Sequence, residues 1–147
     1  MLEQGYNGVA AVLPPHSRPA APLRILIVED QADTAESLAM LLRLEGHEAE
    51  TAPNGAVALQ RAAVGGPDVV LLDLGLPGMD GYEVARRLRA QQAGRRPLLI
   101  AMTGYGREED RRRSAEAGIP LHWLKPVDPD LLLRLLARVK AARSGVR

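Results

Sequence analysis

Cysteine is absent from this sequence of 147 residues, and aromatic side chains make up only 3% of it. Without cysteine the chain has no disulfide framework, no thiol nucleophile and no thiolate zinc site. Redox chemistry at cysteine sulfur is therefore excluded as a function. The absence also fits a reducing compartment, and the cytoplasm is the expected location.

Long apolar runs and an excess of charge of one sign are lacking as well. The longest apolar stretches, residues 68–76 and 131–139, are interrupted or far too short to span a bilayer. Residues 1–22 lack the basic start and continuous apolar stretch of a secretory signal. The formal net charge is only +1, so the chain has no general attraction to nucleic acid or to an anionic membrane. We expect neither partner.

Arginines gather locally in residues 107–113, where a nucleic-acid patch could form. Acidic residues are interleaved with them at spacings that form ion pairs within a helix, namely Glu108, Glu109, Asp110 and Glu116. A solvated helix face is the better interpretation, and no nucleic-acid partner is predicted.

The composition is otherwise typical of one folded domain. Hydrophobic residues make up 46% and charged residues 25%, close to the averages of globular proteins, and the length suits a single core. Residues 1–22 are rich in proline and alanine and show no periodicity, which predicts a flexible tail or linker. The domain is expected at residues 23–143, with a short tail at residues 144–147.

Short apolar runs alternate with amphipathic segments in this domain, which predicts βα units stacked into one parallel sheet. Five strands are expected at residues 24–28, 48–51, 68–72, 98–102 and 122–124. Five helices are expected at about residues 34–44, 55–64, 82–90, 108–117 and 129–143. Asp33 is placed to cap the first helix and Glu36 to close a capping box. The fold class is a doubly wound α/β sheet, whose ligands bind at the carboxyl ends of the strands.

Polar side chains follow four of the predicted strands. Glu29 and Asp30 come after the first, Asp73 after the third, Thr103 after the fourth and Lys125 after the fifth. Taken singly, such residues are usually loop or capping residues. Their joint placement at one sheet edge predicts a site where carboxylates hold a magnesium ion and an aspartate attacks a phosphoryl group.

Four segments resemble, in their order and spacing, the motifs of two-component response-regulator receiver domains. They are residues 28–30, 73–81, 102–104 and 125–126. The resemblance implies a flavodoxin-like fold with Asp73 as the phosphoacceptor. It also implies a Mg²⁺ ion, with Mn²⁺ as a substitute, held by Asp30, Asp73, the backbone carbonyl of Gly75, and Glu29 directly or through water.

The remaining motif residues receive roles from the same resemblance. Thr103 would donate a hydrogen bond to a phosphoryl oxygen, and Lys125 would pair with the phosphoryl group. The Lys125–Pro126 peptide bond is expected to be cis. The position that is commonly Tyr or Phe in the family's switch is His122 here. Gly75 and Tyr105 would flank the path of attacking water, with Tyr105 shielding the acyl phosphate and so tuning its lifetime.

The resemblance further implies a signalling domain rather than an enzyme, limited to self-catalysed phosphorylation from small donors and autodephosphorylation. A histidine kinase or a histidine phosphotransfer protein would supply the phosphoryl group. Phosphorylation would shift the face made by the fourth helix, the fifth strand and the fifth helix, and so control binding of an unidentified downstream protein. A weak homodimer through the same face is also expected.

Alternative functions were weighed against the same residues. An aspartyl-phosphate phosphatase of the haloacid-dehalogenase type needs a second aspartate two positions after the nucleophile, where this sequence has Gly75. A dinucleotide-binding domain needs a glycine-rich turn after the first strand, where Glu29 and Asp30 would repel a pyrophosphate. Within the receiver family, a free-standing domain and the receiver of a hybrid sensor kinase both stay open.

Overall fold

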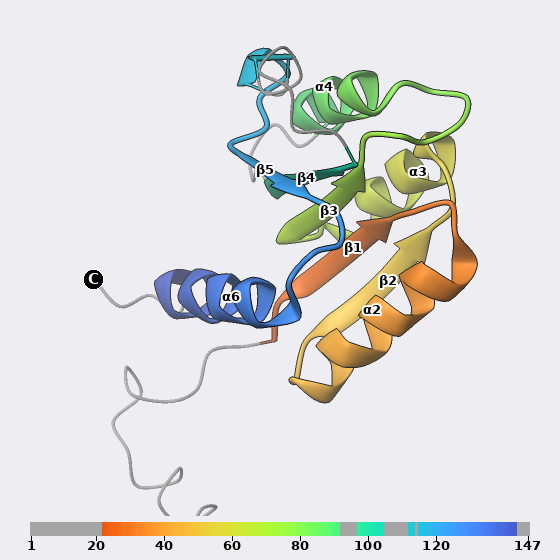
Figure 1. Ribbon diagram of the computed structural model, residues 1–147. Coiled ribbons are helices and arrows are strands. Elements are labelled where there is room, and N and C mark those ends of the chain that lie inside the picture. The colour runs from red at the N-terminus through yellow and green to blue at the C-terminus, as the bar shows by residue number, and fades with distance from the viewer. Residues whose placement is uncertain (1–21, 92–96, 105–111, 114, 144–147) are drawn as a thin grey trace, which may run out of the picture.

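Five parallel strands form the centre of the computed structural model, which describes residues 22–91, 97–104, 112–113 and 115–143. The order across the sheet is β2-β1-β3-β4-β5 (Figure 1). The strands are β1 at Arg24–Val28, β2 at Glu48–Ala52, β3 at Val69–Asp73, β4 at Leu98–Thr103 and β5 at Leu121–Leu124. All five predicted strands are confirmed, and no strand end differs from its predicted place by more than one residue.

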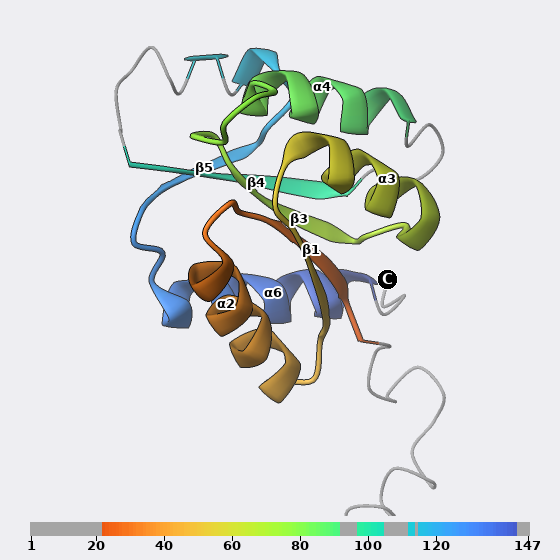
Figure 2. The same cartoon turned by 90° about the vertical axis from the view of Figure 1, so that its right-hand side faces the viewer.

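Helices cover both faces of the sheet (Figure 2). One face carries α3 at Gly55–Gly65 and α4 at Gly81–Gln91, and the other carries α2 at Ala32–Leu44 and α6 at Pro129–Arg143. Half of the helix predicted at residues 108–117 lies outside the described residues, and within the other half residues 112–113 and 115–116 are helical. The described chain is a doubly wound sheet in a single domain, as the sequence predicts. None of its described helices is long and apolar enough to cross a bilayer.

Side chains of alternate residues along the central strands enter two separate cores. Leu26 and Leu72 face α3 and α4, whereas Ile27 and Leu71 face α2 and α6. All five residues of β3 are buried, as expected for the middle strand of a parallel sheet that is covered on both faces. The two cores fix the register of the central strands, and this register fixes where each strand ends.

The start of α2 differs from the prediction. The residue that caps this helix is Gln31, and its side chain makes no capping hydrogen bond, so the prediction of Asp33 as cap is wrong. The helix begins earlier because the buried carboxylate of Glu29 accepts the Gln31 N–H at 3.2 Å and fixes the chain at its entry. Glu36 closes no capping box at Asp33 and pairs instead with Arg43, at 3.0 Å.

Strand order reverses between β1 and β3. The chain leaves β1 for β2 on one side and then crosses to β3 on the other, so the carboxyl ends of β1 and β3 lie beside each other. In the register, Val28 of β1 pairs with Leu72 of β3. The residues that follow these two positions therefore meet at the switch point, where doubly wound sheets bind ligands.

Candidate functional site

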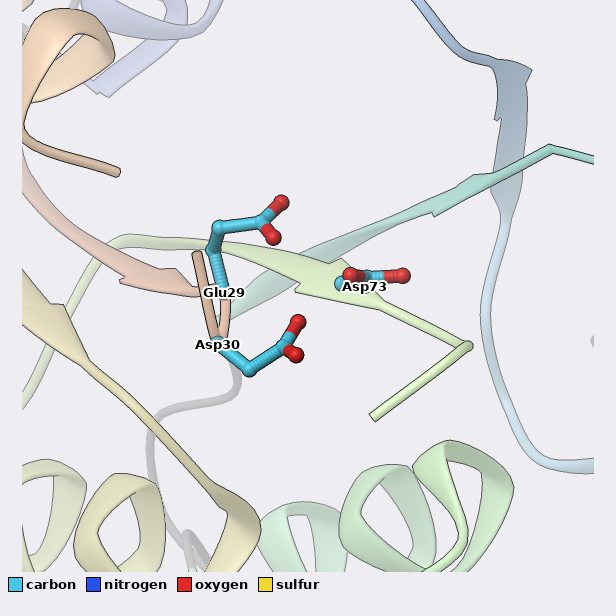
Figure 3. Close-up of side chains that lie close together, drawn as sticks. All are labelled: Glu29, Asp30 and Asp73. Carbon is cyan, nitrogen blue, oxygen red and sulfur yellow. The ribbon is translucent and has the colours of Figure 1, made fainter. Parts of the chain in front are cut away.

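Three carboxylates gather where β1 and β3 end (Figure 3). Glu29 and Asp30 directly follow β1, and Asp73 is the last residue of β3. Oxygen atoms of the three side chains lie within 4.8 Å of one another. Glu29 and Asp73 are buried, with exposed fractions of 3% and 4%, whereas Asp30 is exposed. The adjacent ends of β1 and β3 thus bring together Glu29 and Asp73, which are 44 positions apart in the sequence.

Lys125 bridges the two buried carboxylates. Its Nζ lies 2.9 Å from Asp73 Oδ2 and 3.2 Å from Glu29 Oε1. The backbone N–H of Lys125 donates to the Thr103 carbonyl at 2.7 Å, which extends the pairing of β4 and β5 to the lysine itself. The Lys125–Pro126 peptide bond is cis, as the resemblance implies. The pairing with β4 places Lys125 at the same sheet edge as Asp73, although its strand is two positions from β3 in the sheet.

Burial and charge act against each other at these groups. Burial raises the pKa of Glu29; the Gln31 N–H opposes the rise, the charge of Asp73 adds to it, and Lys125 opposes it. Burial alone would lower the pKa of Lys125, but its hydrogen bond to Asp73 and the charges of both carboxylates outweigh burial and raise it. Lys125 is therefore protonated at neutral pH, and its ammonium group pairs with the buried carboxylates of both Glu29 and Asp73.

The backbone after β3 wraps around Asp73. The Gly75 N–H donates to Asp73 Oδ1 at 2.8 Å, so both oxygens of this carboxylate are held, one by Gly75 and one by Lys125. A pocket of about 600 Å³ opens over Asp73 and is also lined by Asp30, Gly75, Thr103 and Lys125. Thr103 ends β4 and is buried, with an exposed fraction of 7%. The pocket is wide enough to admit a phosphoryl group.

Two further residues were predicted to belong to the site, His122 and Tyr105. His122 is not among the residues that line this pocket. His122 is half-buried on β5 and pairs in register with Ala101 of β4, two positions before Leu124, which pairs with Thr103. Its Nε2 atom is buried. Tyr105 lies outside the described residues, so its predicted shielding of the phosphoryl group stays a prediction.

Three further residues line the pocket and were not predicted from the sequence. They are Asp80, Tyr82 and Arg113, which we call the rim. Arg113 Nη2 lies 3.2 Å from Asp80 Oδ2. The Arg113 guanidinium also lies over the Tyr82 ring, 4.1 Å from its centroid. No local pattern links Arg113 to residues 31 and 33 positions earlier, and the sequence suggested acidic partners on its own helix instead. The contact depends on how the connection between β4 and β5 lies against the start of α4.

Gly81 sets the path of the loop that carries Gly75. A Cβ at Gly81 would lie 2.9 Å from Leu74 Cα and 3.3 Å from the Asp73 carbonyl oxygen, so the backbone would have to move. We expect Gly81→Ala to lower the free energy of unfolding by about 1–3 kcal/mol, the usual cost of overpacking. Urea unfolding measures the effect.

Gly65→Ala is the matched control for this prediction. A Cβ at Gly65 would meet only Glu50 Oε1 at 3.8 Å, an ordinary contact, and the residue lies in a helix. Equal unfolding midpoints for Gly81→Ala and Gly65→Ala would show that the loop is not positioned by this close approach.

Known proteins resemble this chain in both sequence and structure. The family model described as response regulator receiver domain matches residues 25–137. The chain is 38% identical over 116 residues to an uncharacterized 14.6 kDa protein of Leptolyngbya boryana, covering 79% of this chain and 88% of that one. It is 35% identical to the transcriptional regulatory protein ResD of Bacillus subtilis, covering 81% of this chain but only 49% of ResD. It thus spans about half the length of that relative.

A solved structure agrees with these relatives. The CheY-like response regulator receiver domain protein of Methanospirillum hungatei superposes with a TM-score of 0.74 at 30% sequence identity, covering 84% of this chain and 99% of that one.

Proposed function

Since the chain belongs to the response regulator receiver domain family of two-component signalling, we propose that Asp73 is the residue that accepts the phosphoryl group. The family is a signalling family rather than a family of classical enzymes. The observation that carries the proposal is the position of Asp73. Its carboxylate is buried, paired with Lys125 at 2.9 Å, and open to a pocket beside two further carboxylates.

In the proposed reaction, an Asp73 oxygen attacks the phosphorus of a donor and forms a new P–O bond. The donor's bond to phosphorus breaks at the same centre, and its electron pair leaves with the histidine nitrogen of a partner protein or with the acetate of acetyl phosphate. Lys125 holds the carboxylate in place and neutralises charge on the transferring oxygens, and the Thr103 hydroxyl donates to one of them. The product is an acyl phosphate on Asp73.

The residues present suit a divalent cation. Glu29, Asp30 and Asp73 carry three negative charges against the single charge of Lys125, and an oxygen set of this kind binds Mg²⁺, and Mn²⁺ similarly. We assign Asp30, Asp73 and the Gly75 carbonyl as ligands, with Glu29 binding directly or through water. When bound, the ion neutralises charge on the phosphoryl oxygens.

The proposed output is a change at one face of the domain. This face is formed by strand β5, by helix α6 and by the segment that follows β4. Phosphorylation would draw Thr103 toward the phosphoryl group, and His122 would move as the switch residue. Leu124 and Leu131 are both 52% exposed on this face, which supports contact with a downstream protein or a second copy of the chain. A histidine kinase or phosphotransfer protein is the proposed donor.

Acetyl phosphate tests the proposed function directly. With Mg²⁺ present, intact mass spectrometry is expected to detect one added phosphoryl group. Chelation of the metal by EDTA is expected to abolish the adduct, because the carboxylates then repel the anionic donor. Absence of any adduct with Mg²⁺ would contradict the proposal. Steady turnover of a phosphate monoester such as p-nitrophenyl phosphate would instead favour the phosphatase alternative, which Gly75 disfavours.

A further inference from the structure

Arg113 lines the pocket that opens over Asp73, which we call the phosphoryl pocket. It belongs to the helical residues 112–113 in the connection between β4 and β5. Its guanidinium makes two contacts, an ion pair with Asp80 at 3.2 Å and a contact with the Tyr82 ring, whose centroid lies at 4.1 Å. A cation over an aromatic face is attracted by the ring. Both contacts keep the charge among the residues that line the pocket over Asp73.

The partner of Arg113 is itself held firmly. Asp80 Oδ1 accepts the Tyr82 N–H at 3.1 Å, and the Asp80 carbonyl accepts the Val84 N–H at 3.0 Å, so Asp80 starts α4. Its other carboxylate oxygen, Oδ2, is the one that meets Arg113. One oxygen of the Asp80 carboxylate therefore begins the helix, and the other pairs with the guanidinium.

Arg113 is one of two cations among the residues that line the pocket. The lining includes four carboxylates and two cations, namely Glu29, Asp30, Asp73, Asp80, Lys125 and Arg113. Lys125 is engaged with two buried carboxylates, and its side chain is 34% exposed. The Arg113 side chain is 49% exposed, so it is the cation that an incoming anion meets nearer the solvent. Its planar fork of N–H donors suits phosphoryl oxygens.

We propose that Arg113 is a specificity-determining residue of the phosphoryl pocket, which attracts the net negative charge of a donor and so favours donors of net charge −2 over donors of net charge −1. The inference rests on the proposed function of Asp73. The ion pair with Asp80 is exposed on both sides and therefore weak, so the guanidinium can turn from Asp80 to the donor at small cost.

The test compares two small donors on the full chain with saturating Mg²⁺. At neutral pH acetyl phosphate has a net charge of −2, whereas phosphoramidate has a net charge of −1 because its ammonium group offsets one of the two phosphoryl charges. In Arg113→Ala, the apparent second-order rate constant with acetyl phosphate is expected to fall about threefold to fivefold, which corresponds to the upper range for an exposed charge. The rate constant with phosphoramidate should fall clearly less. Arg113→Lys, which keeps the charge, should recover most of the loss.

Two matched variants separate charge from structure. Arg112→Ala removes the neighbouring exposed arginine, which is not among the residues lining the pocket, and should leave both rate constants unchanged. Asp80→Asn removes a carboxylate that competes with the donor for Arg113, so the rate constant with acetyl phosphate should exceed that of the wild type. The effect of Arg113→Ala should also shrink at high ionic strength, because salt screens exposed charges.

Contrary results are distinguishable. If the wild type is phosphorylated but Arg113→Ala behaves like Arg112→Ala, or slows both donors equally, the inference is wrong and the function of Asp73 stands. If Asp80→Asn slows phosphorylation as much as Arg113→Ala does, the pair is only a structural tie, and the inference is again overturned. If the wild type takes up no phosphoryl group from either donor, the proposed function itself fails.

Discussion

Replacement of Asp73 by asparagine is expected to abolish phosphorylation by acetyl phosphate while leaving the fold intact. The amide has nearly the shape of the carboxylate but lacks its negative charge and its nucleophilic oxygen. Loss of a nucleophile of this kind lowers a rate by about a thousandfold or more. Intact mass spectrometry after incubation with Mg²⁺ and acetyl phosphate measures the effect, and the Asp73→Asn protein should show no adduct.

The stability of the Asp73→Asn protein makes this result interpretable. Asp73 is one of two buried carboxylates that share Lys125, and its charge raises the pKa of Glu29. Removing that charge relieves repulsion, so the unfolding midpoint without divalent cations should not fall below that of the wild type. Asp130→Asn, a change of the same kind at an exposed residue of α6, should leave the adduct unchanged. An equal adduct on Asp73→Asn would place the phosphoacceptor elsewhere.

The central strands β1, β3 and β4 could be predicted from the sequence because burial on both faces requires continuous apolar runs. β3, with all five residues buried, is the clearest case. The start of α2 could not be predicted in the same way. Asp33 and Glu36 fit a capping box, but the Glu29 carboxylate holds the Gln31 N–H, and this contact depends on the sheet edge rather than on local sequence.

The same division applies to the site. Residues at or directly after strand ends, such as Asp73, Glu29 and Lys125, could be placed together because the parallel sheet fixes where strand ends lie. The rim could not, because Arg113 and Asp80 are 33 positions apart and meet through two connections that leave the sheet. Arginine among acidic neighbours gives the same sequence pattern whether it lies in solvent or over a pocket.

Replacement of Lys125 by methionine is expected to have the second large effect, because it removes the only ammonium group that contacts both buried carboxylates among the described residues. Methionine keeps much of the side-chain volume and loses the charge. Phosphorylation by acetyl phosphate should slow about a hundredfold, as when one donor to a transition-state oxyanion is lost. Timed mass spectrometry with saturating Mg²⁺ measures the rate.

Stability provides an independent readout of the same change. Leaving two carboxylates buried without their cation should lower the free energy of unfolding by about 1–3 kcal/mol in EDTA, less than for a fully buried pair because Lys125 is partly exposed. Urea unfolding measures this loss, and Lys140→Met on α6 is the matched control.

Mg²⁺ is expected to reverse part of the loss in Lys125→Met, because a bound cation supplies the positive charge that the lysine no longer provides. The stability gained on adding Mg²⁺ should therefore be larger in Lys125→Met than in the wild type or in Lys140→Met. An equal gain in all three proteins would contradict the view that Lys125 and the divalent cation neutralise the same carboxylates. Unchanged stability of Lys125→Met in EDTA would mean that other groups neutralise the charges of Glu29 and Asp73. This result would count against a cation site at this sheet edge.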